Sequence, residues 1–240
     1  MQEYVLSELD TGERLISERV SSVRSVALGF WIGAGSVAEA DSEAGISHLL
    51  EHMLFRGTDR FGSEEIDQIF DEMGSEINAG TDKEATSLYT RVLDRHLERA
   101  FDVISDMVSN PRFGELEAER EVVLEEIAMY EDDPQDRVFD VLGEAIFGPH
   151  PLGRAVIGSA SVVAAATREQ LVAFHSQRYL PTRIVIAAAG SVDHDAVVEM
   201  TRRAESVGAL AALGTAQATA APAAPDFAPR VRFLLSLIHI

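Results

Sequence analysis

Two histidines separated by three residues, His48 and His52, constrain the fold of this chain more than any other feature. On an α-helix, residues four positions apart lie on one face, so both imidazole rings can reach one metal ion if this segment is helical. Glu51 directly precedes His52, which places its carboxylate at the rim of the same site. The segment therefore predicts a helix with a metal site on one face.

The order of these residues, H-x-x-E-H, is the inverted zinc-hydrolase motif. Neutral imidazole nitrogens hold Zn²⁺ at about 2.0–2.1 Å and leave a position open for water. A carboxylate such as Glu51, beside that position, can accept a proton from the water. The alternative is an amphipathic helix whose two histidines are exposed or hydrogen-bonded within the core.

A zinc site with two histidines needs a third protein ligand, which is often a carboxylate. Glu119 and Glu126 are two helical turns apart, so they share one face of a helix predicted over residues 115–131. Glu125 is rotated by about 100° from Glu126 and should point elsewhere. The spacing alone also fits a solvated acidic helix face, so it leaves the role of these carboxylates open.

Four segments together resemble the M16 family of zinc peptidases, which includes pitrilysin, insulinase and the mitochondrial processing peptidase. The segments are His48 to Thr58, Asn78 to Thr86, Glu119 to Glu126 and Gly148 to Gly158. The resemblance covers most of residues 1–205 and is nearest to the short bacterial, processing-peptidase-like branch.

This resemblance implies that His48, His52 and Glu126 are zinc ligands. It implies that Glu51 is the general base. It also implies that Glu119 supports catalysis without binding the metal itself, as a carboxylate next to the ligands. The implied activity is that of a zinc-dependent endopeptidase, which hydrolyses extended or unfolded peptides with a metal-activated water. The alternative is a non-catalytic M16-like subunit that binds peptides or scaffolds a complex, and the retained motif favours the enzyme.

A second set of residues is expected to bind the substrate: Asn78, Ala79 and Glu84. In the family, this region lies beside the peptide and pairs with it as an added strand. An exposed sheet edge suits that role, because backbone hydrogen bonds hold a peptide of any sequence. For Asn78, a simple turn position is an equally good interpretation.

The predicted fold class is α+β, because hairpins coexist with runs of helices. The strands are expected at residues 2–8, 13–19, 24–32, 76–78, 85–92 and 183–189. The helices are expected at residues 41–56, 63–74, 94–109, 115–131, 135–146, 167–178 and 194–206. Asp41 should cap the first helix, and Phe30 and Trp31 should lie in the core. The family resemblance implies a mixed, largely antiparallel sheet with helices packed on it, as in the M16 metallohydrolase domain.

Residues 1–207 are predicted to form the peptidase domain, and residues 208–229 have the Ala-, Thr- and Pro-rich composition of a linker. Residues 230–240 would begin a second half. Within them, residues 235–240 either resemble a translated adapter sequence foreign to the protein or are a genuine strand broken off by truncation.

The resemblance also implies partners. A second homologous half, or a partner subunit, should close a chamber around the peptide substrate, and the protein should be a dimer. We therefore expect this chain alone to be weakly active or inactive.

Composition excludes several classes of partner and site. A net charge of −20 repels nucleic acid and anionic membranes, so neither is an expected partner. The absence of cysteine excludes disulfides and thiolate zinc sites, and it is compatible with the cytoplasmic location that we expect. The first 20 residues lack the apolar core of a signal peptide, and no run of 18 apolar residues occurs.

Overall fold

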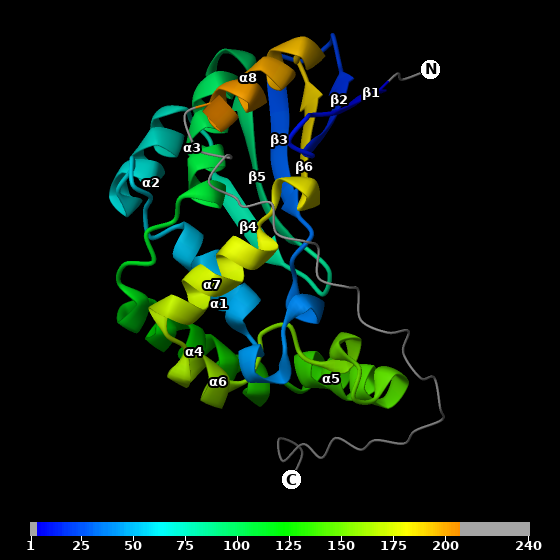
Figure 1. Cartoon of the computed structure of the whole chain (residues 1–240), viewed down its shortest axis with the longest axis vertical. Helices are drawn as coiled ribbons and strands as arrows, with labels where there is room; N and C mark the ends of the chain where they lie inside the picture. The colour runs from blue at the N-terminus through cyan, green and yellow to red at the C-terminus, as the bar shows by residue number, and fades with distance from the viewer. Residues whose placement is uncertain (1–3, 207–240) are drawn as a thin grey trace.

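One mixed sheet of six strands organises residues 4–206, the part of the chain that this computed structural model describes. Its strand order is β1-β2-β6-β3-β5-β4 (Figure 1). The strands are β1 (Tyr4–Glu8), β2 (Arg14–Arg19), β3 (Ser25–Ile32), β4 (Ile77–Thr81), β5 (Thr86–Leu93) and β6 (Ile184–Gly190). Among the described strands only β2 and β6 pair in parallel, so the expected α+β class and largely antiparallel sheet are confirmed.

Eight α-helices are described within residues 4–206. They are α1 (Ile46–Leu54), α2 (Ser63–Glu72), α3 (Leu97–Ser109), α4 (Leu116–Asp132), α5 (Pro134–Phe147), α6 (Ala160–Ala165), α7 (Arg168–Arg178) and α8 (His194–Ser206). Short 3-10 turns are η1 (Ser36–Ala38), η2 (Asp41–Glu43), η3 (Asp94–His96), η4 (Pro151–Gly153) and η5 (Pro181–Arg183). The predicted helices therefore have counterparts in the structure, and α6 is an additional short helix that the sequence interpretation assigned to no element.

The burial pattern of the central strand β3 distinguishes the two faces of the sheet. Val26, Leu28, Phe30 and Ile32 are fully or almost fully buried, whereas Ala27 and Trp31 are exposed. Because successive side chains of a strand point to opposite faces, this alternation marks one covered face and one open face. The prediction that Trp31 lies in the core is wrong for this reason: its strand position directs it to the open face, where 42% of the residue remains exposed.

Helix α1 begins later than the sequence predicted. Asp41 does not cap it, because η2 ends at Glu43 and Gly45 then adopts a φ of +104°, which breaks the helical path before Ile46. Gly158, with a φ of +88°, lies against Gly45 so closely that an added Cβ would be 2.2 Å from the Gly45 Cα atom. This backbone contact docks the loop after α5 onto the start of α1.

Helix α1 lies between several elements and is held by one apolar face. Ile46, Leu49, Leu50, Met53 and Leu54 are buried, and the helix contacts β4, α4 and α7. Residues 207–240, which include the predicted linker and the start of a second half, lie outside the described residues, so the predicted domain division stays a prediction.

Candidate metal centre

Three side-chain atoms from α1 and α4 form a nearly equilateral triangle. The Nε2 atoms of His48 and His52 are 3.3 Å apart, and the Oε2 atom of Glu126 lies 3.6 Å from the first and 3.4 Å from the second. Ligand atoms at about 2.05 Å from a tetrahedral metal ion are about 3.3 Å from one another. The three residues can therefore hold a metal ion the size of zinc.

The helices explain this arrangement. His48 and His52 lie one turn apart on α1, and their side chains are 12% and 21% exposed, whereas Glu126 from α4 is 48% exposed. Helix α4 buries Leu116, Glu119, Val123 and Ile127, which places Glu126 beside the buried stripe, where it reaches α1. The imidazoles thus form the floor of the site and the carboxylate stands at its rim.

Glu119 lies behind His52 and outside the triangle. Its Oε1 atom is 2.9 Å from Nδ1 of His52, and its Oε2 atom contacts Nε of Arg56. An ionised carboxylate can only accept a hydrogen bond, so it holds the proton on Nδ1 and leaves the Nε2 lone pair directed at the triangle. Only 5% of the Glu119 side chain is exposed, and Arg56 supplies it with a counter-charge.

The protonation state of His48 suits metal binding. Burial, and secondarily the charge of His52, lower the pKa of His48 below its ordinary value. A lower pKa favours the neutral imidazole, which is the form that binds a metal ion.

Glu51 borders the same cavity, which has a volume of about 610 Å³ and is also lined by His48 and Glu126. Its Oε2 atom accepts a hydrogen bond of 2.6 Å from the hydroxyl of Thr81 on β4. Burial raises the pKa of Glu51, and the hydrogen bond from Thr81 opposes that rise. A carboxyl group with a raised pKa is a stronger base once it is ionised, which suits an acid–base role.

The residues predicted to bind substrate are not brought into this cavity. Asn78 is exposed and lines the open face of the sheet, Ala79 packs against the core, and Glu84 is exposed on the turn after β4. The structure instead brings Thr81 to the cavity from the same edge strand. The period of two along β4 could have indicated this, because Thr81 lies on the same face as Ala79.

Glu39 holds the start of α1, a role that the sequence did not indicate. Its buried carboxylate accepts hydrogen bonds from the backbone N–H groups of Ser47, at 2.7 Å, and Gly45, at 3.1 Å. These donors belong to the first turn of the helix, which Gly45 cannot cap because it has no side chain. Burial raises the pKa of Glu39 to about 7, although both backbone hydrogen bonds oppose the rise.

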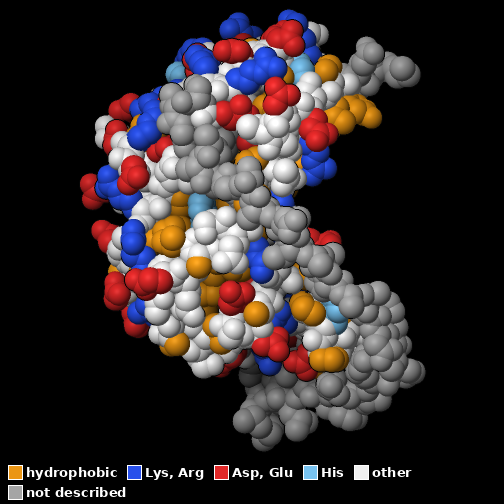
Figure 2. All heavy atoms as spheres, in the orientation of Figure 1, with side chains coloured by type: hydrophobic (Ala, Val, Ile, Leu, Met, Phe, Trp, Pro, Cys, Tyr) orange, Lys and Arg blue, Asp and Glu red, His pale blue; other side chains and the backbone are white. Residues whose placement is uncertain are grey.

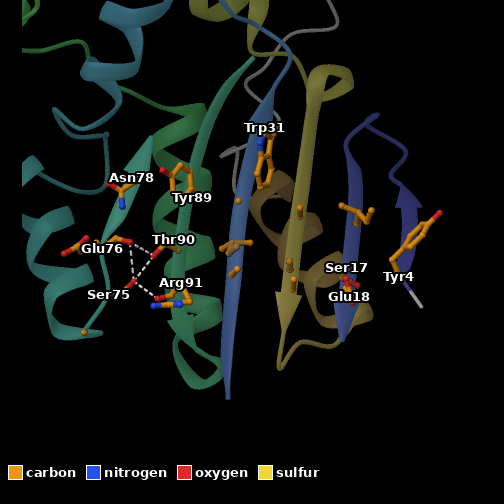
Figure 3. A pocket seen from close by; sticks show the side chains of 18 of the residues that line it. Tyr4, Ser17, Glu18, Trp31, Ser75, Glu76, Asn78, Tyr89, Thr90 and Arg91 are labelled. Carbon is orange, nitrogen blue, oxygen red and sulfur yellow. Dashed lines mark hydrogen bonds between the residues drawn. The ribbon is translucent and has the colours of Figure 1, made fainter. Parts of the chain in front are cut away.

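The open face of the sheet carries a larger depression, of about 1070 Å³. Ala27, Gly29, Ala187 and Ala189 form its floor, and Figure 3 shows Trp31 and Tyr89 rising from neighbouring strands. An added Cβ on Gly29 would be 2.4 Å from the Trp31 ring, so the ring lies over this glycine. On edge strand β1, large apolar side chains are exposed, and Figure 2 shows apolar atoms gathered at that end of the molecule.

Sequence comparison agrees with this architecture. Residues 14–160 match the family model described as insulinase, peptidase family M16, and residues 165–231 match the model described as peptidase M16 inactive domain. The chain belongs to the M16 peptidase family. The resemblance seen in the sequence is thereby confirmed.

Relatives of this M16 chain include an uncharacterized zinc protease of Mycobacterium tuberculosis. It is 47% identical over 196 residues, which are 81% of this chain and 45% of the relative. A probable mitochondrial-processing peptidase subunit beta of Arabidopsis thaliana is 38% identical over 82% of this chain and 38% of that protein. The chain thus spans about half the length, or less, of the curated relatives that it matches.

Solved structures share the fold. A protease from Helicobacter pylori superposes with a TM-score of 0.83 at 22% identity, over 95% of this chain and 54% of that one. The first half of the periplasmic protease PqqL from Escherichia coli gives 0.76 at 23% identity, over 96% and 50%. Among residues 4–206, no helix combines the length and apolar character that crossing a membrane requires.

Replacing Glu39 with Gln should change how the stability of the chain depends on pH. The folded-state pKa of about 7 exceeds the ordinary value of 4.5. The folded chain therefore binds more protons than the unfolded chain between these values. The stabilising contribution of Glu39 is fully present below about pH 4.5 and is lost as the pH rises through about 7. The loss is on the order of 3 kcal/mol.

Urea unfolding of the 240-residue chain between pH 4 and 8 measures this effect. The free energy of unfolding of the wild type, relative to Glu39→Gln, should fall across that range. Glu84→Gln changes an exposed carboxylate and serves as the control, which should follow the wild type. Parallel pH curves for the wild type and Glu39→Gln would contradict the prediction.

Proposed function

We propose that this chain is the zinc-holding half of an M16 metalloendopeptidase that hydrolyses extended or unfolded peptides. The observation that carries the proposal is the triangle of His48, His52 and Glu126, with Glu51 bordering the same cavity. The relatives named as zinc proteases support zinc as the metal. The donor set of two imidazoles and one carboxylate, with an open position, is the one that catalytic zinc sites use.

The chemistry divides between the metal and the protein. When bound, Zn²⁺ supplies a Lewis acid that polarises a carbonyl group and lowers the pKa of water. Glu51 takes the proton of the attacking water and afterwards gives it to the leaving amine nitrogen, as a general base and then a general acid. Glu119 keeps the His52 ring oriented, and Arg56 keeps Glu119 in place.

The peptide is proposed to bind in an extended form along β4. This strand lies at one end of the sheet and pairs only with β5 among the described strands, so its outer edge can hydrogen-bond to a peptide backbone. Asn78, Ala79 and Glu84 remain the proposed substrate-contacting residues of this segment. A non-catalytic role as a peptide-binding subunit is the alternative.

The closed chamber is proposed to require a second half or a partner subunit. The relatives are about twice as long as this chain, and the open face carries aromatic side chains over a floor of small residues. A dimer of half-length units would satisfy the same need.

Glu126→Gln should weaken zinc binding far more than Glu125→Gln, because only Glu126 reaches the two histidines. The zinc affinity should fall by more than the roughly 10–100-fold that is typical when a residue hydrogen-bonded to a metal ligand is replaced. Glu119→Gln should fall between the two variants. Competition with a zinc chelator measures the three affinities, and equal affinities for the Glu125 and Glu126 variants would show that the ligand is misassigned.

Glu51→Gln should retain zinc and lose peptide hydrolysis. The side chain borders the cavity without belonging to the triangle, and removal of a general base lowers the rate by roughly 10²–10⁴-fold. Zinc analysis and a peptide assay on the protein joined to its second half test this. Full activity of the variant would refute the role of Glu51. Zinc binding without any cleavage by the wild type would support the non-catalytic alternative.

The 240-residue chain alone should bind zinc but cleave peptides poorly. All three ligands are present, yet one wall of the chamber is not, and positioning of the reactants contributes several kcal/mol to lowering the barrier. The kcat/KM of the chain should be compared with that of a protein carrying the genuine second half, at equal zinc occupancy. Equal values would show that residues 1–205 are a self-sufficient peptidase.

A further inference from the structure

The contact between Thr81 and Glu51 links two parts of the fold that have separate roles in the proposed function. Thr81 is the last residue of the edge strand β4, and Glu51 lies on the metal-binding helix α1. The Thr81 hydroxyl donates a hydrogen bond of 2.6 Å to Oε2 of Glu51. One carboxylate oxygen is therefore held by the sheet, while Oε1 lies outside this bond.

The direction of the Thr81 hydroxyl is set by the strands. Thr81 pairs with Thr86 in the β4–β5 register, and Thr86 is fully buried. The Thr86 hydroxyl donates its proton to the carbonyl of Ala34, at 2.8 Å. The two threonine hydroxyls are 3.4 Å apart, and each has only one proton, which is already used. The Thr81 hydroxyl therefore has one proton to donate, and Glu51 receives it. The backbone N–H of Thr81 also hydrogen-bonds to Glu51, so the strand end holds this carboxylate through both groups.

A glutamate without such a partner would not keep one position. Its side chain has several rotatable bonds, and a partner on the sheet that holds one oxygen removes this freedom before the substrate arrives. A β-branched residue on a strand is well suited to this task, because its first side-chain torsion is restricted.

We infer that Thr81 is a positioning residue that fixes the carboxylate of Glu51 for proton transfer. This inference rests on the proposed function of Glu51 as the general base. The hydroxyl of Thr81 bonds to Glu51 rather than to the three residues of the triangle, and in this role it does not touch the reacting atoms. Its effect passes through Glu51, and it should appear in the turnover rate rather than in substrate or zinc binding.

Three variants in the protein joined to its second half test the inference. Thr81→Val removes the hydroxyl and keeps the shape, and Thr81→Ser keeps the hydroxyl. Thr90→Val is the matched control, because Thr90 is likewise a threonine of the β4–β5 pair. Its hydroxyl donates to the Glu76 carbonyl, at 2.7 Å, and does not contact Glu51.

Thr81→Val should lower kcat by roughly 10–100-fold, as expected for loss of orientation of a catalytic group, with KM and zinc affinity within about threefold of the wild type. Thr81→Ser should recover most of kcat, and Thr90→Val should leave it unchanged. In a Glu51→Gln background, Thr81→Val should cause no further loss, because both changes act on the same group. Any one of three results would overturn the inference. They are an unchanged kcat in Thr81→Val, an additional loss of kcat in the double variant, and failure of Thr81→Ser to recover activity.

A crystal structure of zinc-free Thr81→Val decides the inference independently of activity. The Glu51 side chain should leave its position or lose order in this variant, and it should stay in place in Thr90→Val. An unmoved Glu51 in Thr81→Val would refute the positioning role, even if the protein proves to be a peptidase. Displacement of Glu51 in a protein that cleaves no peptide would instead uphold the contact and refute the proposed function.

Discussion

Burial of one face of α1 is the interaction on which the rest of the site depends. The helix is only nine residues long, and a helix of that length is not stable in water by itself. Its five apolar residues are buried against the sheet and neighbouring helices, and Glu39 satisfies its first backbone donors. With the helix fixed in this way, His48, Glu51 and His52 must occupy the face that meets α4 and β4.

Each of these three residues of α1 then acquires a partner from a distant segment. Glu126 approaches both histidines from α4. Glu119, two turns earlier on the same helix, hydrogen-bonds to His52, and Thr81 on β4 hydrogen-bonds to Glu51. These partners are carboxylates and hydroxyls held in polar contacts, as a buried polar group requires. The site is thus an assembly of long-range contacts around one short helix.

The local part of this assembly could be predicted from the sequence. The spacing of His48 and His52 predicted a shared helical face, and the period of α4 placed Glu119 and Glu126 together, with Glu125 turned away. The roles of Glu39, Arg56 and Thr81 were not predicted, because their contacts join segments whose packing no local pattern specifies. The start of α1 was misplaced because the sequence does not reveal a positive φ at Gly45. Trp31 was misplaced because hydrophobicity alone does not distinguish a covered sheet face from an open one.

The backbone contact between Gly45 and Gly158 has a consequence for the order in which the protein can mature. The two glycines are more than one hundred residues apart in sequence, yet the start of α1 rests on the loop that contains the second. Contacts between such distant segments form late, because closing a long stretch of chain costs entropy. During synthesis from the N-terminus, both histidines and Glu126 leave the ribosome before Gly158 does. A nascent chain would therefore carry all three ligands before the loop that packs against the start of α1 has been synthesised.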